Sequence, residues 1–144
     1  MKSKSMKMAT ADELMFKILS RKAEIGIIGL GYVGLPLAMA LSEAGFKVTG
    51  YDIAKEKVKL LNSGKSDIDD IPDKQVKAAV ESGNFHATGD PKSMTQMDVL
   101  SICVPTPLSK TKDPDVSYIL AAVDWVKRYY KRGTLVILES TTYP

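Results

Sequence analysis

The spacing of three glycines constrains the fold of this chain more than any other feature. Gly29, Gly31 and Gly34 follow the pattern G-x-G-x-x-G between an apolar run, residues 24–29, and a segment of helical character, residues 35–45. Gly29 permits a tight turn, and Gly34 lets a helix pack closely against the preceding strand. The pattern therefore predicts a strand, a glycine turn and a helix, which together begin a βαβ unit.

Strands and helices are predicted to alternate along the rest of the chain. Further strands are expected at residues 46–52, 85–88, 98–104 and 134–140, and helices at 10–21, 54–64, 72–83, 91–97 and 116–133. Continuous apolar strands, such as 98–104, are typical of a parallel sheet with both faces covered. The sequence thus predicts an α/β fold of the Rossmann type, an open, mostly parallel sheet with helices on both faces.

Length and composition favour one domain and argue against several functional classes. The chain has 144 residues and a net charge of +3, so we expect a single domain at residues 10–144. Residues 1–9 are predicted to be a disordered leader or a segment added for expression. The modest, dispersed charge does not indicate nucleic acid, and no apolar run approaches the ~20 residues of a membrane span. One cysteine and one histidine argue against a disulfide and a metal site, and the expected location is the cytoplasm.

The glycine turn is also typical of a dinucleotide site. Gly31 would let a pyrophosphate approach the main chain, and the positive end of the following helix favours phosphate. Asp52 ends the second predicted strand, near the ~20-residue separation expected for an acid that binds the ribose of NAD. Its charge would repel the 2′-phosphate of NADP, although Lys55 or Lys57 could pair with that phosphate. A turn that serves only packing is the alternative.

Two further predicted strands end in polar or proline-rich segments. One leads into Val104-Pro105-Thr106-Pro107, and the other into Glu139-Ser140-Thr141-Thr142. Ligands bind beyond the carboxyl ends of strands in an open parallel sheet, so Thr106 and Thr141 could face the far half of a dinucleotide. Turn formation and helix capping explain the same threonines equally well. The spacing alone leaves both interpretations open.

Four short motifs together resemble one enzyme family. They are GLGYVGLPLA, VPTPL, PDVSYI and LESTTYP, and the similarity runs from Glu24 to Pro144. In this combination the chain resembles the NAD-binding domain of the UDP-glucose/GDP-mannose dehydrogenase family. The VPTPL and ESTTYP motifs are most similar to the UDP-N-acetylglucosamine 6-dehydrogenase branch. A stand-alone dinucleotide-sensing module and another NAD-dependent dehydrogenase are the alternatives, but neither accounts for these two motifs.

The resemblance implies a cofactor, a reaction and a partner. Enzymes of this family oxidise the C6 alcohol of a UDP-sugar to a uronic acid in two NAD-dependent steps, through a covalent adduct on a cysteine. The full-length enzyme is expected to be a cytoplasmic homodimer or larger assembly that serves polysaccharide biosynthesis and binds neither nucleic acid nor membrane. The family's nucleophilic cysteine, general-base lysine and sugar-binding residues lie in segments that this chain lacks. We therefore expect the chain to bind NAD without catalysing the reaction.

The resemblance also implies roles for individual residues. Val33 would lie at the pyrophosphate turn, Asp52 and Lys57 at the adenosine ribose, and Thr106 and Thr141 near the nicotinamide. Thr141 alone is expected to contribute to catalysis, by positioning a water. The expected cofactor-binding residues are Gly29, Gly31, Tyr32, Val33, Gly34, Asp52, Lys57, Val104, Pro105, Thr106, Glu139 and Thr141. No metal site is expected.

Several other residues that could carry chemistry are interpreted as structural. Cys103 lies in an apolar strand and is expected to be buried and inert. His86 is expected at the surface of a short outer strand. Trp125 lies at helical spacing with three tyrosines, and all four are expected in the core or at its rim, the tyrosines being Tyr118, Tyr129 and Tyr130.

Overall fold

The computed structural model describes the main chain of residues 2–139 and the side chains of residues 10–139. Helices and strands follow one another in nearly strict alternation. In chain order they are α1 (Lys2–Leu19), β1 (Glu24–Ile28), α2 (Gly34–Glu43), β2 (Lys47–Tyr51), α3 (Lys55–Asn62), α4 (Asp73–Glu81), β3 (Phe85–Thr88), the 3₁₀ helix η1 (Pro91–Gln96), β4 (Val99–Ile102), α5 (Ser117–Tyr129) and β5 (Leu135–Leu138).

The five strands form one sheet with β1 at its centre. Their order is β3-β2-β1-β4-β5, and every adjacent pair is parallel. Ile25 of β1 stands beside Val48 of β2 and Val99 of β4. Because all strands run in the same direction, their carboxyl ends lie at one edge of the sheet, where open α/β folds bind ligands. The observed sheet confirms the predicted fold of the Rossmann type.

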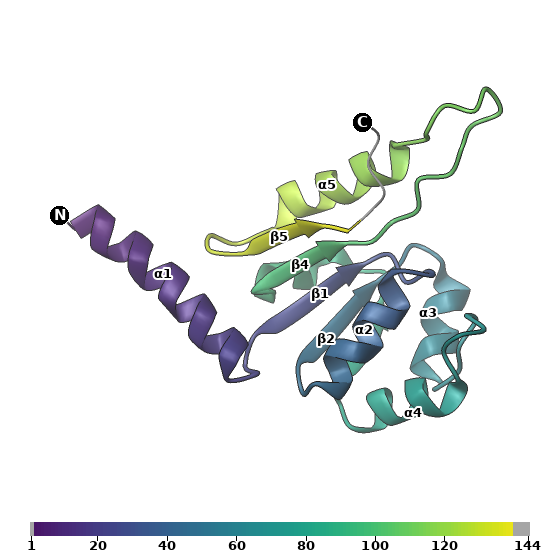
Figure 1. The fold of residues 1–144 in the computed structure, drawn as a ribbon, viewed down its shortest axis with the longest axis horizontal. Helices are drawn as coiled ribbons and strands as arrows, with labels where there is room; N and C mark the ends of the chain where they lie inside the picture. Colours follow the sequence, from purple (N-terminus) through teal and green to yellow (C-terminus); the bar gives the residue numbers. More distant parts are fainter. Residues whose placement is uncertain (1, 140–144) are drawn as a thin grey trace.

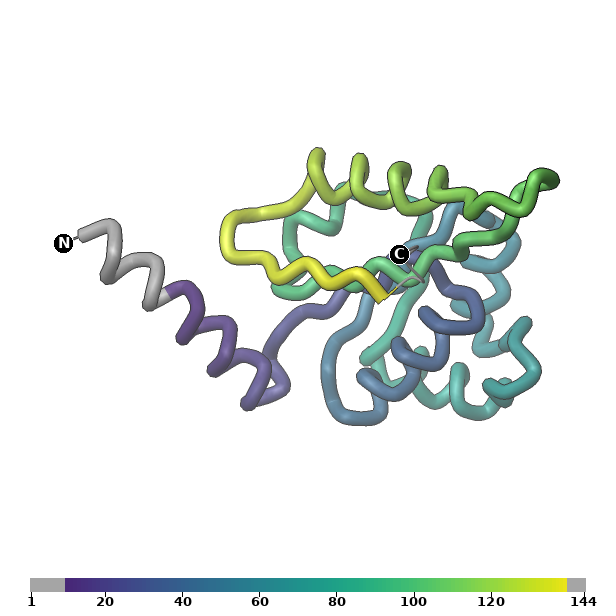
Figure 2. Tube along the Cα trace, turned by 45° about the horizontal axis from the view of Figure 1, so that its top comes forward, coloured from purple at the N-terminus to yellow at the C-terminus, as the bar shows by residue number. Residues whose placement is uncertain are grey.

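Helices cover both faces of this sheet and enclose two apolar cores. Helices α2, α3 and α4 pack on one face, whereas η1 and α5 pack on the other, as Figure 1 and Figure 2 show. The first core includes Leu35 and Leu61, and the second includes Met94, Leu100 and Val126. All four residues of β4 are buried, which explains why its sequence is a continuous apolar run.

Two helices differ from the sequence-based expectation. Helix α1 begins at Lys2, whereas the sequence predicted a helix from residue 10; that residues 1–9 are a leader stays a prediction. On α5, the apolar residues Leu120 and Val123 are exposed, because this helix buries only a narrow face against η1 and β4. Within the described part of the chain, no helix is both long and apolar enough to cross a membrane.

Asp98 joins several segments at the amino-terminal edge of the sheet. Its Oδ2 accepts a hydrogen bond from the Glu24 amide at 2.9 Å, and its Oδ1 accepts from Nζ of Lys17 at 3.2 Å and of Lys131 at 3.1 Å. Burial alone would raise the pKa of Asp98, but these hydrogen bonds outweigh burial and hold the pKa below its ordinary value. The ionised carboxylate therefore connects β1, α1 and the segment before β5.

Asp98→Asn is expected to lower the free energy of unfolding at neutral pH by about 2 kcal/mol, because hydrogen bonds to a buried charge are lost. In the unfolded chain the pKa of this carboxyl is about 3.9. Its contribution to the free energy of unfolding is therefore complete above that pH. The contribution is lost as the pH falls through the lower pKa of the folded state. Urea denaturation of both proteins at neutral pH and at about pH 3 should therefore show a smaller difference at the acidic pH.

Asp124→Asn is the control for this comparison, because the ion pair that Asp124 forms with Arg128 is exposed. Its effect on unfolding should be small at both pH values. A difference between the parent and Asp98→Asn that stays the same at acidic pH would contradict the assignment of an ionised Asp98.

Candidate functional site

A pocket of about 300 Å³ lies at the carboxyl ends of β1, β2 and β4. Four parts of the chain form its walls: the glycine turn after β1, the end of β2 with the start of α3, the segment after β4, and one side of α5. Residues that are far apart in the sequence meet here because the parallel strands end at the same edge. The pocket lies where the alternation of strands and helices predicted a ligand site.

Each glycine of the turn has its own steric role. Gly29 has a φ of 95°, which glycine adopts without strain. A Cβ on Gly34 would overlap the carbonyl oxygen of Gly29 and lie 3.2 Å from Cβ of Cys103. A Cβ on Gly31 would meet no atom within 4 Å, and Gly31 lines the pocket. Two glycines thus serve the fold, and the third leaves space for a ligand beside the main chain.

The beginning of α2 follows the glycine turn, and two of its first amides are already bound: the Leu35 amide donates to the Gly31 carbonyl oxygen at 3.1 Å and the Leu37 amide to that of Val33 at 3.3 Å. Its N-cap residue, Val33, has no side-chain hydrogen bond that would cap the helix, and no acidic residue lies in the first turn. Pro36 has no amide hydrogen, so the amides of the turn itself and the partial positive charge at the helix start are the features that attract anions. The turn and the helix start can therefore bind phosphate groups.

Asp52 and Lys57 bind both polar main-chain atoms of Leu30, which lies inside the glycine turn. Oδ2 of Asp52 accepts a hydrogen bond from the Leu30 amide at 3.1 Å, and Nζ of Lys57 donates to the Leu30 carbonyl oxygen at 3.0 Å. The other oxygen of Asp52 accepts from the Ala54 amide at 2.9 Å. These contacts fix the turn against β2 and α3, and they place a carboxylate and an ammonium at the pocket.

Sequence reasoning missed Asp67, which forms an ion pair with Lys57. Oδ2 of Asp67 lies 3.1 Å from Nζ of Lys57. Asp67 belongs to the loop of residues 63–72 between α3 and α4, where the sequence indicates only a polar connection. No sequence signal pointed to this pair, because the separation of two residues across a loop does not predict their distance.

The wall on the α5 side is apolar. Tyr118, Ala121, Ala122 and Trp125 line it, and their spacing places them along one side of the helix. Trp125 also packs against the second core, as expected, whereas its position beside the pocket and that of Tyr118 were not expected. Two small residues between two aromatic residues at helical spacing are the sequence signal that could have indicated such a surface. This wall can accept a flat, apolar part of a ligand.

The pocket brings together half of the predicted cofactor residues. Those that line it are Gly29, Gly31, Asp52, Lys57, Val104 and Pro105. Gly34 is buried beneath the turn, and Tyr32 and Val33 are exposed. The remaining two described residues of the set, Thr106 and Glu139, do not line the pocket. Thr141, for which a catalytic role was predicted, lies outside the described residues.

Cys103 and His86 lie where the sequence indicated. Cys103 is 5% exposed at the end of β4. Burial raises the pKa of its thiol, and a hydrogen bond with Ser101 opposes this only in part, so the thiol stays protonated and unreactive. His86 is exposed on β3. Over residues 10–139, no three side chains of the metal-binding types lie close enough together to hold an ion.

Comparison with known proteins gives a consistent result. Residues 23–144 match the model of the UDP-glucose/GDP-mannose dehydrogenase family, NAD binding domain. A UDP-N-acetyl-D-mannosamine dehydrogenase from Pyrococcus horikoshii is 40% identical over 121 residues, which are 83% of this chain and 29% of that protein. An NDP-N-acetyl-D-galactosaminuronic acid dehydrogenase from Ralstonia nicotianae is 42% identical over 119 residues, or 82% of this chain and 27% of that protein.

The fold agrees with a solved structure of the same group. The structure of the UDP-D-ManNAc dehydrogenase from Pyrococcus horikoshii superimposes with a TM-score of 0.79 and 41% sequence identity. The match covers 84% of this chain and 29% of that chain. The chain thus spans less than a third of the length of the relatives that it matches.

Gly34→Ala and Gly31→Ala are expected to differ sharply in stability. The methyl group at position 34 would collide with the Gly29 carbonyl, so we expect a loss of about 2 kcal/mol or more in the free energy of unfolding. The methyl group at position 31 would point into open space, so a change within about 0.5 kcal/mol is expected. Urea denaturation of the parent and of each variant measures the two changes in the free energy of unfolding. Equal losses for the two variants would contradict the geometry of the turn.

Proposed function

Because this chain belongs to the UDP-glucose/GDP-mannose dehydrogenase family and matches the family's NAD-binding domain, we propose that the pocket at the carboxyl ends of β1, β2 and β4 is the NAD site. One observation carries the proposal: the open side of Gly31 and the carboxylate of Asp52 line the same pocket. A main chain that a pyrophosphate can approach and an acid that can bind ribose hydroxyls are the groups that NAD requires at such a turn.

The adenosine half of NAD fits the described residues. The main-chain amides of the glycine turn would bind the pyrophosphate, and the partial positive charge at the start of α2 would favour it. Asp52 would accept hydrogen bonds from the adenosine ribose hydroxyls, and Lys57 would donate to them. Ile53 is 72% exposed although it is apolar, and it lines the pocket together with the α5 wall. Packing of the adenine ring between Ile53 and that wall would cover this exposed surface.

The nicotinamide half would extend toward the ends of β4 and β5. Bound NAD supplies the hydride acceptor of the reaction. We propose that Val104, Pro105 and Thr106 approach this half from β4, and Glu139 and Thr141 from β5. Tyr32 and Val33 would cover the pyrophosphate from the outside of the turn, which accounts for their exposure in the free chain.

The activity of the complete enzyme is inferred from its relatives. We propose that it oxidises the C6 alcohol of a UDP-sugar to a uronic acid in two NAD-dependent steps, as a cytoplasmic homodimer or larger assembly. The VPTPL and ESTTYP motifs favour the UDP-N-acetylglucosamine 6-dehydrogenase branch. The names of the relatives above also contain N-acetylated sugars, which supports an N-acetylated nucleotide sugar as the substrate class.

The chain is expected to bind NAD more tightly than NADP, and Asp52→Asn should weaken NAD binding by about tenfold or more. The asparagine oxygen can still accept from the Leu30 amide, whereas its NH2 group cannot accept from the Ala54 amide, and the charge that binds the ribose hydroxyls is removed. Gly31→Ala should weaken NAD binding by a similar factor, because its methyl group occupies the space of the pyrophosphate. Isothermal titration calorimetry measures the dissociation constants.

Asp124→Asn is the matched control, because it removes the same charge from the exposed surface of α5. It should bind NAD as the parent does. If the parent chain bound neither dinucleotide, or if Asp52→Asn and Gly31→Ala bound NAD unchanged, the proposed site would be wrong.

With NAD and UDP-N-acetylglucosamine, this chain by itself is expected to form no NADH. Its one cysteine, Cys103, is buried and has a raised pKa, so it cannot serve as the nucleophile of the family's covalent adduct. The absorbance of NADH provides the measurement. NADH formation that disappears in Cys103→Ser would contradict this expectation.

A further inference from the structure

The loop that carries Asp67 is held firmly on both sides of that residue. On one side, the Ser66 amide donates to Oδ1 of Asp73 at 2.8 Å. On the other side, Ile68 is 6% exposed in the first core, and its amide donates to Oγ of Ser66 at 3.0 Å. The main chain on both sides of Asp67 is therefore held by the fold.

Lys57 is the cation that this carboxylate holds. The ammonium has three N–H donors; one is directed to the Leu30 carbonyl oxygen, and Oδ2 of Asp67 lies 3.1 Å from Nζ as an ion pair. The Lys57 side chain is 20% exposed and that of Asp67 is 34% exposed, so the pair is only partly screened by water. The remaining donor can serve a neutral acceptor such as a ribose hydroxyl.

The charged groups in contact with Lys57 or with the turn that it binds sum to a negative value. Asp52 and Asp67 each contribute one negative charge, and Lys57 contributes one positive charge, which leaves a net charge of −1 at neutral pH. Lys55 does not line the pocket, because it lies two positions from Lys57 and therefore on another side of α3. A 2′-phosphate would thus meet excess negative charge and a lysine that is already paired.

We infer that Asp67 is a specificity-determining residue of the cofactor site: by pairing with Lys57, it withholds that cation from a 2′-phosphate and so favours NAD over NADP. This inference rests on the NAD site proposed above. Asp67 acts through Lys57 and is therefore a positioning residue. The sequence left open whether Lys55 or Lys57 could pair with the 2′-phosphate of NADP, and on this inference neither does.

The test compares the dissociation constants of NAD and NADP for the parent chain and for Asp67→Asn. The ratio of the NADP constant to the NAD constant is expected to fall about fivefold, the upper range for a partly exposed ion pair. NAD itself should bind somewhat more weakly, because Lys57 loses one of its two anchors. A purely structural role would weaken both dinucleotides by the same factor and leave the ratio unchanged.

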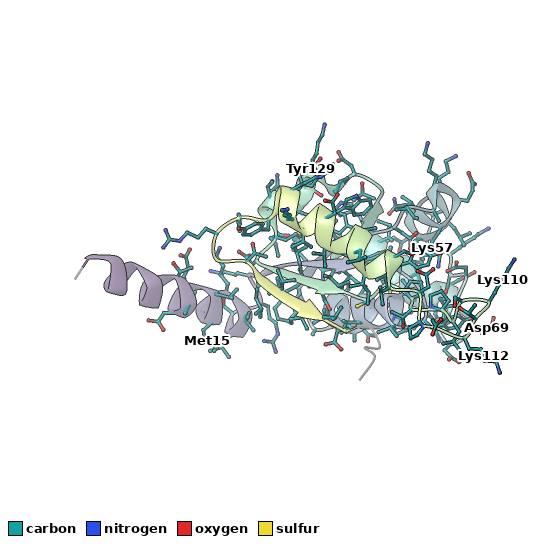
Figure 3. The ribbon with its side chains drawn as sticks, turned by 90° about the horizontal axis from the view of Figure 1, so that it is seen from above. Met15, Lys57, Asp69, Lys110, Lys112 and Tyr129 are labelled. Carbon is teal, nitrogen blue, oxygen red and sulfur yellow. The ribbon has the colours of Figure 1, made fainter. Side chains whose placement is uncertain are left out.

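Asp69→Asn is the matched control. Asp69 lies two residues from Asp67 in the same loop and is exposed, and Figure 3 shows it at the same end of the molecule as Lys57. Its substitution removes the same charge without breaking the pair, so the ratio should change less than about twofold. Asp67→Glu keeps the carboxylate and should retain the parent ratio. In a Lys57→Gln background, Asp67→Asn should have no further effect on the ratio.

Each outcome separates this inference from the proposed function. A fall in the ratio for Asp67→Asn but not for Asp69→Asn or Asp67→Glu supports the role of Asp67. NAD binding by the parent with an unchanged ratio in Asp67→Asn, or an equal fall in Asp69→Asn, overturns the inference alone. Failure of the parent chain to bind NAD overturns the proposed function and the inference together.

Discussion

The close contact between the start of α2 and the glycine turn is the constraint on which the rest of the structure depends. No side chain fits between Gly34 and the Gly29 carbonyl, so α2 can begin directly against the end of β1. This contact places Leu30 in the interior, where Asp52 and Lys57 bind its amide and its carbonyl oxygen. The glycine turn, the end of β2 and the start of α3 are thereby held around one pocket.

The two edges of the sheet use charged groups in different ways. At the amino-terminal edge, Asp98 is buried among hydrogen-bond donors, and all of its partners belong to the chain itself. At the carboxyl edge, Asp52 and Lys57 line an open pocket, and the ammonium is held by the Leu30 carbonyl oxygen and by the ion pair with Asp67. The first arrangement stabilises the fold, whereas the second can exchange part of its contacts for a ligand.

Most of the fold and part of the site could be predicted because their signals are local. Alternating apolar segments and turns predicted the sheet, and Gly31 and Asp52 predicted one end of the pocket. The α5 wall with Tyr118 and Trp125 was not predicted, because a helix with apolar residues on several sides does not reveal which side packs on the sheet. For the same reason, the sequence did not indicate that Leu120, an apolar residue of α5, is exposed.

The sequence by itself determined the order of the elements, the steric need for glycine in the turn and the acid at the end of β2. These depend on neighbouring residues, whose geometry the covalent chain limits. Only the tertiary structure decided that Asp67 reaches Lys57 and that α5 turns Trp125 toward the pocket. Such contacts depend on the path of a loop and the rotation of a helix, which packing of the whole domain selects from many local possibilities.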